Sequence, residues 1–259
     1  MDLELHGKTA LVTGSTAGIG LEIARRLAAE GANVVICGRS QEKLDDAAAD
    51  IGGNVRAVLA DPATAEGAAA LIAAVPAADI LVNNLGIYEP RDFGEIDDAD
   101  WFRLFEVNVM SGVRLSRHYL PAMKAGNWGR IIFISSEGAL MVPPDMIHYC
   151  MTKTAQLTIS RGLAETTRGT GVTVNTVMPG PTRSAGIVDF LRSGASNPDA
   201  PAEEIEREFL EKKRPTSLIR RMIEPQEVAA TVAFLASPLA AATNGAAIRV
   251  EGGILPTIA

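Results

Sequence analysis

The 259-residue chain is poor in the residues that metal sites and disulfide frameworks require. It has only two cysteines, Cys37 and Cys150, and three histidines, and none of them falls in a Cys-x-x-Cys or zinc-ligand spacing. We therefore expect two reduced thiols and no metal site. The N-terminal residues lack the apolar run of a signal peptide, and no window approaches the length of a membrane span. A cytoplasmic protein with no membrane partner is the resulting prediction.

Basic residues are also fewer than acidic residues. The chain has 24 Lys and Arg residues against 31 Asp and Glu residues, a formal net charge of −7, and no basic block of the kind that follows a phosphate backbone. Nucleic acid is therefore not an expected partner. The hydrophobic fraction of 47% is enough for one large core, and there is no repeat or linker. We predict a single domain over residues 1–259.

Short apolar runs alternate with amphipathic stretches along the chain. Residues 9–13 form a run that enters a glycine-rich turn, which is followed by a helical pattern ending near Gly31 and by a second apolar run at 33–37. Strand, turn, helix and strand make a βαβ unit, and near-continuous Val, Ile and Leu runs indicate a parallel sheet buried on both faces. Further strands are expected at 55–60, 79–83, 131–135, 172–177 and 246–250, and further helices at 65–75, from about 98, from Tyr149 to Gly169, at 202–213 and at 226–236.

The glycine-rich turn has the spacing G-x-x-x-G-x-G. Gly14 permits the tight turn, Gly18 lets backbone approach a pyrophosphate, and Gly20 lets the helix pack close to the strand. The N-terminus of the following helix would supply N–H groups and a positive dipole to the phosphates. A turn of this kind between a strand and a helix predicts a dinucleotide site.

Tyr149 and Lys153 form a Tyr-x-x-x-Lys pair downstream of Ser136. On a helix they are i and i+4 neighbours, which places an ammonium beside a phenol. At ~4 Å and an effective dielectric of ~20, this pairing is worth about 4 kcal/mol, which would lower the pKa of the phenol by roughly three units. A phenol that titrates near neutrality can donate and accept a proton, while Ser136 would donate a hydrogen bond to an oxygen on the reacting carbon.

Several motifs follow one another along the chain in a fixed order. They are Thr13-Gly14-x-x-x-Gly18-Ile19-Gly20, Asp61, Asn83-Asn84-Leu85-Gly86, Asn108, Ser136, Tyr149-x-x-x-Lys153, and Asn175 with Pro179-Gly180. Together they resemble the motifs of the short-chain dehydrogenase/reductase family, in its single-domain form, over essentially the whole chain. The resemblance implies an α/β fold with a doubly wound (Rossmann) parallel sheet of about seven strands, flanked by helices on both faces.

The resemblance also implies a role for each catalytic residue. Tyr149 would be the acid/base, Lys153 would lower its pKa and bind the nicotinamide ribose, and Ser136 would polarise the substrate carbonyl. Asn108 would hold the water that links Lys153 to solvent. The implied cofactor-binding residues are Gly14, Ser15, Thr16, Gly18, Ile19, Gly20, Asp61, Pro62, Asn84, Gly86, Tyr149, Lys153, Pro179, Gly180 and Thr182.

Arg39 favours NADP(H) over NAD(H). The second strand ends Cys37-Gly38-Arg39-Ser40, without the carboxylate that would bind the adenosine ribose hydroxyls and repel a 2′-phosphate. A guanidinium at this place can instead clamp a phosphate. Against this, Ala17 stands where NADP(H) users of the family often have a second basic residue, so NAD(H) stays an alternative.

An apolar lining is expected for the substrate pocket, with a lid at about 184–221. These walls suit a medium-sized apolar ketone or a 3-oxoacyl-type compound, and the lid would order on binding. The candidate pocket residues are Tyr88, Glu137, Leu140, Val142, Met146 and Ile187.

Three functions are compatible with these patterns. The first is an NADP(H)-dependent carbonyl reductase, the second an NAD-dependent secondary-alcohol dehydrogenase with the same catalytic residues, and the third a non-catalytic nucleotide-binding protein. The complete set of Asn108, Ser136, Tyr149 and Lys153 argues against the third. The resemblance further implies a homo-oligomer, a dimer or a tetramer, paired through helices near 98–118 and 149–168.

Overall fold

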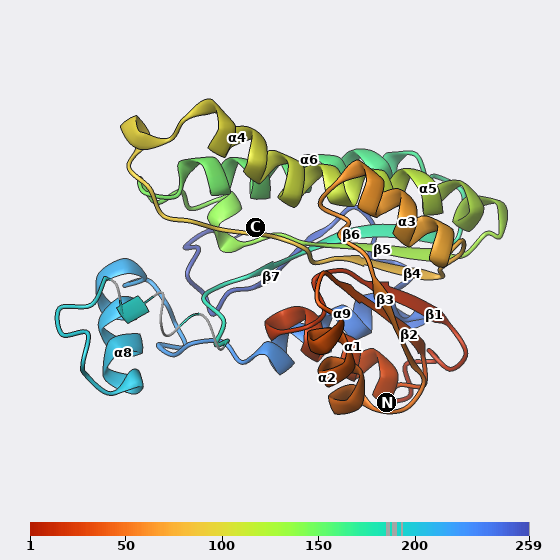
Figure 1. Ribbon diagram of the computed structural model, residues 1–259, viewed down its shortest axis with the longest axis horizontal. Helices are drawn as coiled ribbons and strands as arrows, with labels where there is room; N and C mark the ends of the chain where they lie inside the picture. Colours follow the sequence, from red (N-terminus) through yellow and green to blue (C-terminus); the bar gives the residue numbers. More distant parts are fainter. Residues whose placement is uncertain (185–186, 188–190, 193, 259) are drawn as a thin grey trace.

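Seven strands form one parallel sheet in the computed structural model, which describes residues 1–184, 187, 191–192 and 194–258 (Figure 1). The strand order is β3-β2-β1-β4-β5-β6-β7. This confirms the doubly wound α/β fold, because the chain starts in the middle of the sheet and builds outward in both directions. The strands are β1 (Thr9–Val12), β2 (Asn33–Gly38), β3 (Val55–Leu59), β4 (Ile80–Asn83), β5 (Gly129–Ile134), β6 (Val172–Pro179) and β7 (Ala247–Val250).

Helices cover both faces of this sheet, as Figure 1 shows. One layer holds α3 (Ala65–Ala74), α4 (Asp98–Phe105), α5 (Ser111–Ala125) and α6 (Ile147–Glu165), and the other holds α1 (Gly18–Ala29), α2 (Gln41–Ile51) and α9 (Pro225–Ala236). A further helix, α8 (Ala202–Lys213), projects from the edge of the molecule beyond β6.

Two helices differ from the predicted elements. The sequence analysis did not predict α2, although Ser40 caps it by accepting a hydrogen bond from the Lys43 N–H and Leu44 lies on its buried face. The helix that carries Tyr149 ends at Glu165 rather than at Gly169.

The strands alternate their side chains between two cores. Val12, Ile36 and Val82 point to the layer of α1, α2 and α9, while their neighbours Leu11 and Leu81 point to the layer of α3, α5 and α6. All five side chains are fully buried. This explains why the strands appear as continuous apolar runs in the sequence.

The strand order reverses between β1 and β4. At this point the loop after β1 and the loop after β4 are joined by hydrogen bonds. The Asn84 side-chain amide donates to the carbonyl oxygens of Thr13 and Gly14, both at 3.0 Å, and the Thr13 hydroxyl accepts from the N–H groups of Asn84 and Leu85, also at 3.0 Å. Ligands of open α/β sheets bind at such a switch point, beyond the carboxyl ends of the strands.

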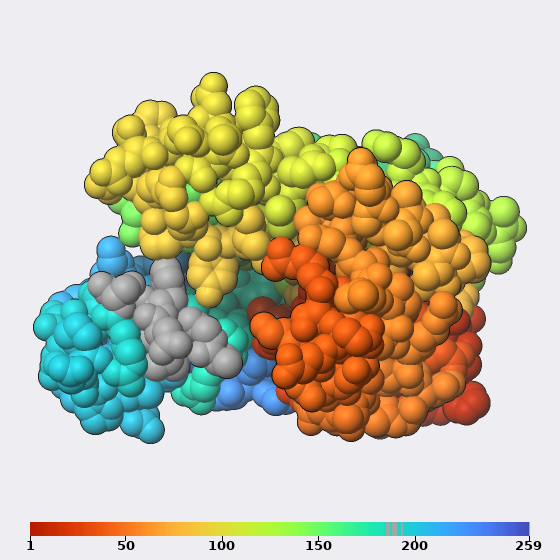
Figure 2. All heavy atoms as spheres, in the orientation of Figure 1, coloured from red at the N-terminus to blue at the C-terminus, as the bar shows by residue number. Residues whose placement is uncertain are grey.

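The α8 segment forms one end of the molecular surface. In Figure 2 its cyan atoms lie at the lower left, with the orange N-terminal segment on the right and the yellow segment around α4 above the cyan atoms. Within the described ranges, no helix is both long enough and apolar enough to cross a membrane.

Candidate active site

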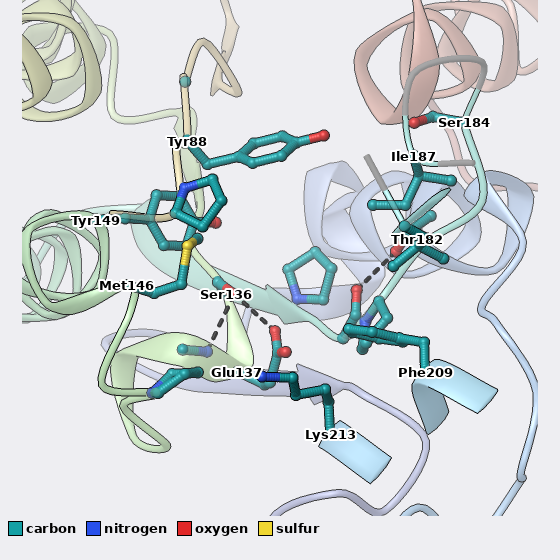
Figure 3. Close-up of a pocket in the computed structure, with 18 of the residues that line it drawn as sticks. Tyr88, Ser136, Glu137, Met146, Tyr149, Thr182, Ser184, Ile187, Phe209 and Lys213 are labelled. Carbon is teal, nitrogen blue, oxygen red and sulfur yellow. Dashed lines mark hydrogen bonds between the residues drawn. The ribbon is translucent and has the colours of Figure 1, made fainter. Parts of the chain in front are cut away.

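A cavity of about 670 Å³ lies at the carboxyl ends of the central strands. Its walls come from the glycine turn before α1, the loop after β4, the segment from β5 to α6, the loop after β6, and α8. Figure 3 shows Ser136, Tyr149 and Tyr88 on one side of it and Thr182, Ile187 and Phe209 on the other. The topology therefore brings segments that are far apart in the sequence to one hollow.

Ser136 and Tyr149 both line this cavity. Ser136 lies two residues after the end of β5 and caps a short 3₁₀ turn, Glu137–Ala139, because its Oγ accepts a hydrogen bond of 3.0 Å from the Gly138 N–H. The same Oγ donates a hydrogen bond of 2.7 Å to Glu137 Oε2. Tyr149 lies in the first turn of α6. The predicted pair of hydroxyl side chains is thus present on one wall.

Lys153 lies behind Tyr149 and is 5% exposed. Its Nζ donates a hydrogen bond of 3.0 Å to the Ile134 carbonyl oxygen and lies 5.6 Å from the centroid of the Tyr149 ring. Burial lowers the pKa of Lys153 from 10.5 to about 8. A lysine with this pKa keeps most of its positive charge at neutral pH.

The expectation that Lys153 lowers the pKa of the Tyr149 phenol is wrong in this structure. Burial raises the pKa of the Tyr149 phenol above its ordinary value, and the smaller opposite effect comes from Ser136. Desolvation dominates because the Lys153 ammonium is directed at the Ile134 carbonyl. Sequence spacing identified the neighbours but not the direction in which the ammonium points.

Asn108 lies in a five-residue π-helical turn, Glu106–Met110, between α4 and α5. Turns of this type are frequent at functional sites. Its side chain is held on both sides: Nδ2 donates to the Ile87 carbonyl at 2.9 Å and to Thr152 Oγ1 at 3.0 Å, and Oδ1 accepts from the Ile87 N–H at 2.8 Å. Asn108 therefore ties the loop after β4 to α6.

Gln156 is a site residue that the sequence analysis missed. It is 1% exposed, its Nε2 donates a hydrogen bond of 2.6 Å to the Asn108 carbonyl oxygen, and its Oε1 accepts one of 3.5 Å from Lys153 Nζ. The spacing from Lys153 to Gln156 is i to i+3 on α6, which places the two side chains on one helix face, and this spacing was the available signal.

The predicted cofactor residues divide into two groups. The side chain of Ser15 is fully buried; its hydroxyl donates to the Val12 carbonyl and accepts from the Cys37 N–H, so it supports the turn. Ser15, Thr16, Arg39, Asp61, Pro62 and Lys153 are outside the cavity lining. The residues in the lining are Gly14, Gly18, Ile19, Gly20, Asn84, Gly86, Tyr149, Pro179, Gly180 and Thr182.

Arg39 and Asp61 lie together at the ends of the neighbouring strands β2 and β3. Arg39 Nε is 3.9 Å from Asp61 Oδ2, and the Arg39 side chain is 80% exposed. Because most of the Arg39 side chain is exposed, an anion can reach its guanidinium from solvent. The tertiary structure thus places the two residues predicted for the adenosine end side by side.

The substrate side of the cavity needs one correction. Tyr88, Glu137, Met146 and Ile187 line it as expected. Leu140 and Val142 do not, since their side chains point to solvent and are 54% and 53% exposed. The 3₁₀ turn after Ser136 directs this short stretch outward. In their place α8 contributes Phe209, Lys212, Lys213 and Arg214.

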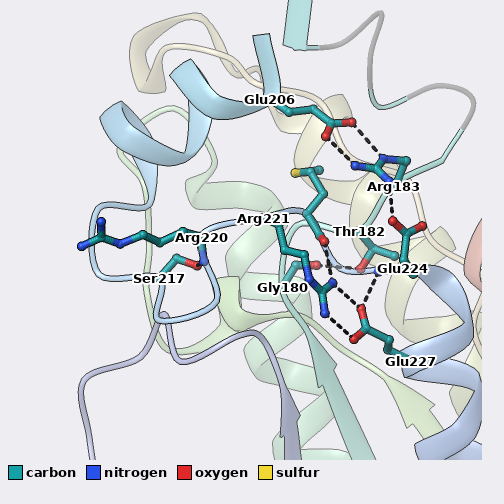
Figure 4. A network of polar contacts seen from close by, with 10 residues as sticks. Gly180, Thr182, Arg183, Glu206, Ser217, Arg220, Arg221, Glu224 and Glu227 are labelled. Atoms are coloured by element: carbon teal, nitrogen blue, oxygen red, sulfur yellow. Dashed lines mark hydrogen bonds and ion pairs between the residues drawn. The ribbon is translucent and has the colours of Figure 1, made fainter. Parts of the chain in front are cut away.

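Ion pairs anchor the segment expected to be a lid (Figure 4). Arg183 makes a two-pronged contact with Glu206 of α8, with N–O distances of 3.0 and 2.7 Å, and also pairs with Glu224. Arg221 makes two bonds of 2.7 Å to Glu227 at the start of α9. Part of the expected lid at 184–221, namely 185–186, 188–190 and 193, lies outside the described residues.

The turn before α1 fits a nucleotide phosphate. Gly18 has a φ of +55°, and a Cβ on Gly20 would stand 2.3 Å from the Gly14 carbonyl oxygen and 2.4 Å from Asn84 Nδ2. Ala17 precedes α1 without a side-chain cap, so the first N–H groups of the helix face the cavity side without that competitor. Only glycine at position 20 allows the helix to lie this close to the Gly14 carbonyl and the Asn84 side chain. A tight glycine turn before a helix N-terminus suits the pyrophosphate of a dinucleotide.

Comparison with known proteins gives the same result. The profile of the family described as short chain dehydrogenase matches residues 8–193. The chain is 50% identical to the uncharacterized oxidoreductase YvaG of Bacillus subtilis, with all of both chains covered, and 32% identical to the 3-oxoacyl-[acyl-carrier-protein] reductase FabG of Rickettsia felis, with 98% of this chain and 99% of the relative covered.

A solved structure extends the likeness to the whole fold. L-sorbose reductase from Gluconobacter frateurii, complexed with NADPH and L-sorbose, superposes with a TM-score of 0.93 at 32% identity, covering 100% of both chains. The chain thus belongs to the short-chain dehydrogenase/reductase family and is an NAD(P)-dependent oxidoreductase that acts on CH–OH and C=O groups.

Proposed function

We propose that this protein is an NADP(H)-dependent reductase that interconverts a ketone and a secondary alcohol, with Tyr149 as the acid/base. The observation that carries the proposal is the joint position of Ser136 and Tyr149 on one cavity wall, with the Lys153 ammonium buried behind them. The glycine turn that suits a dinucleotide lies in the same cavity.

Each side chain then has a task in the reductive direction. The Tyr149 phenol donates a proton to the carbonyl oxygen, and the Ser136 hydroxyl donates a hydrogen bond to the same oxygen. Lys153 stabilises the phenolate that remains. A bound nicotinamide cofactor supplies the hydride. Because burial raises the pKa of Tyr149, the phenol stays protonated at neutral pH, and the Lys153 ammonium has to stabilise the phenolate for the proton to leave.

The preference for NADP(H) is supported by charge at the end of β2. The exposed Arg39 guanidinium is placed to pair with a 2′-phosphate, and β2 ends without a carboxylate. The L-sorbose reductase structure contains NADPH. Asp61, 3.9 Å from Arg39, binds the adenosine end in this proposal. An NAD-linked alcohol dehydrogenase is the alternative, because it uses the same catalytic residues.

We also propose that segment 184–221 acts as a substrate lid and that the chain forms a homo-oligomer, a dimer or a tetramer, in the cytoplasm. The lid is supported by α8 residues in the cavity wall.

The oligomer is supported by Phe102 of α4, which is 72% exposed and adds to the apolar surface of the helices predicted to pair. A light-scattering mass equal to one chain would refute the oligomer.

The deciding experiment follows NADPH and NADH oxidation in parallel with a panel of ketones. The panel holds β-keto esters, an acetoacetyl thioester, aromatic ketones, a diketone and L-sorbose. We expect turnover with NADPH that falls by about 10²–10⁴-fold in Tyr149→Phe, while NADPH still binds to the variant. Unchanged turnover in Tyr149→Phe would refute the assigned acid/base, and a failure to bind either cofactor would refute the family function in this chain.

A further inference from the structure

We infer that Glu137, held by Arg214, selects ketones that carry a hydroxyl group on the carbon next to the carbonyl. The inference rests on the proposed ketone reduction and narrows its substrate class. It departs from the apolar or 3-oxoacyl substrate that the sequence alone favours, because it places a charged acceptor beside the reacting carbonyl.

Glu137 is a buried carboxylate in the wall of the cavity. Its side chain is adjacent to the catalytic serine in sequence and in space, and the residue is only 5% exposed. In Figure 3 it lies beside Ser136, with Lys213 beyond it. Buried carboxylates are rare unless they are paired or have a function, so its partners decide its role.

One carboxylate oxygen is paired with Arg214 at the end of α8. Glu137 Oε1 accepts hydrogen bonds from Arg214 Nε at 3.1 Å and from Nη2 at 3.0 Å. Arg214 is itself largely buried, with 12% of its side chain exposed, and stacks near the Phe209 ring. This pair fixes the orientation of the carboxylate and compensates its charge.

The other oxygen competes with the substrate for Ser136. Ser136 has one hydroxyl proton, and it is donated to Glu137 Oε2 at 2.7 Å, while the lone pairs of Oγ accept from the Gly138 N–H. When Ser136 turns its proton to a carbonyl oxygen, Glu137 Oε2 loses its donor. A buried carboxylate oxygen without a donor is costly.

A hydroxyl group next to the carbonyl resolves this conflict. The carbonyl oxygen and the hydroxyl oxygen on adjacent carbons lie about one hydrogen-bond length apart, which matches the 2.7 Å between Ser136 Oγ and Glu137 Oε2. The carbonyl oxygen accepts from Ser136, and the hydroxyl donates to Glu137. A ketone without the hydroxyl leaves Glu137 Oε2 without a donor, while Oε1 keeps its bonds to Arg214, and sites of this kind strongly reject such analogues.

Other charged groups near the cavity are less suited to this role. Lys213 and Asp145 are 3.9 Å apart with side chains 62% and 39% exposed, so water can satisfy both. Glu208 also lines the cavity, but it pairs with Lys212 at 2.6 Å, and the side chains are 21% and 61% exposed. Glu137 alone among these carboxylates combines burial with a bond to the catalytic serine.

The test compares hydroxyacetone with butanone, which has a methyl group in place of the hydroxyl. With saturating NADPH, we expect the wild-type protein to prefer hydroxyacetone by about 100-fold in kcat/KM. In the double variant Glu137→Leu/Arg214→Met, which removes the buried pair as a unit, we expect this ratio to fall by about tenfold or more. The ratio is the readout, so a general loss of rate does not affect it.

The matched control removes a second carboxylate–guanidinium pair, in which Glu206 of α8 is buried and Arg183 of the loop after β6 is half-exposed. Glu206 is 7% exposed and binds Arg183 in two bonds, but neither residue contacts Ser136. The variant Glu206→Leu/Arg183→Met is expected to keep the hydroxyacetone preference. Loss of the preference in this control as well would refute a specific role for Glu137.

The remaining outcomes also separate the two proposals. If wild-type protein reduces both ketones with similar kcat/KM, or if the preference survives in the Glu137/Arg214 variant, the inference is wrong and the proposed function stands. A preference for a keto acid over hydroxyacetone would assign Arg214 to a substrate carboxylate and overturn the inference. If no ketone is turned over with either cofactor, the proposed function itself fails.

Discussion

The side-chain amide of Gln156 joins the backbone of Asn108 to the ammonium of Lys153. Its Nε2 donates a 2.6 Å hydrogen bond to the Asn108 carbonyl oxygen, and its Oε1 lies 3.5 Å from Lys153 Nζ. The resemblance to the family implies that Asn108 holds the water that links Lys153 to solvent, and Gln156 contacts both residues. We therefore expect Gln156 to position Lys153 in the proposed reaction.

Replacement of Gln156 should change the pH dependence of catalysis. Gln156→Leu removes an acceptor that stabilises the ammonium, so the pKa of Lys153, already lowered to about 8, should fall further. The ammonium form is the active one, and the upper limb of the kcat–pH profile should therefore move to lower pH. Gln156→Glu retains an acceptor and adds negative charge, so it should move this limb to higher pH. Identical profiles in all three proteins would exclude a positioning role.

The stability of the protein without added cofactor should depend on Lys153 in a defined pH window. Its pKa is lowered from 10.5 to about 8 by burial, so between these values the unfolded chain binds more protons than the folded one. The stability contribution of Lys153 is therefore present above about pH 10.5 and is lost as the pH falls through 8. Relative to Lys153→Met, the wild-type melting temperature should rise by roughly 5 °C from pH 7.5 to 10. A pH-independent difference between the two proteins would contradict the assignment.

Arg39→Ala should weaken the use of NADPH selectively. Removing the exposed guanidinium takes away a charge-assisted contact with a 2′-phosphate, worth about 1.5–3 kcal/mol, so kcat/KM for NADPH should fall by about 10–100-fold. The value for NADH should change little, because NADH has no phosphate there. An equal loss for both cofactors would refute phosphate recognition by Arg39, and a clear NADH preference in the wild-type protein would favour the NAD-linked alternative.

Gly20→Ala should damage the cofactor turn. The added Cβ would meet the Gly14 carbonyl oxygen at 2.3 Å, and a backbone atom cannot move aside without opening the turn. We expect a loss of about 1–3 kcal/mol in the free energy of unfolding and a weaker Kd for NADPH. Gly162→Ala on α6 is the control, because nothing lies within 4 Å of its new Cβ. This exposed helical site should gain about 0.5–1 kcal/mol. Normal NADPH binding by Gly20→Ala would contradict the proposed close approach.

Hydrogen exchange tests the lid. The amides of α8 should exchange more slowly once NADPH and a ketone are bound, because α8 residues form part of the cavity wall. Arg183→Gln breaks the contacts with Glu206 and Glu224 and should speed exchange in α8 without altering exchange in the β1–β4 core. Equal protection of α8 with and without ligands would count against lid motion.

Periodicity and turn chemistry were sufficient for most of the fold. The apolar runs at β1, β2, β4, β5 and β6 were predicted because strands buried on both faces must be apolar on both faces. The helix α2 was missed, although its cap Ser40 and its buried Leu44 mark it, because its remaining residues are mostly polar. Motif order, rather than any single motif, identified Ser136, Tyr149 and Lys153.

The sequence by itself determined the fold class and the glycine turn and predicted the catalytic side chains, because these depend on local spacing, on motif order and on the backbone freedom of particular residues. Only the tertiary structure decided how those side chains are paired. It turned Leu140 and Val142 out to solvent, directed Lys153 at the Ile134 carbonyl, and raised the pKa of Tyr149 by burial. It also brought Arg214 to Glu137 across 77 residues of chain, since contact partners and desolvation depend on three-dimensional packing and leave no periodic signal in the sequence.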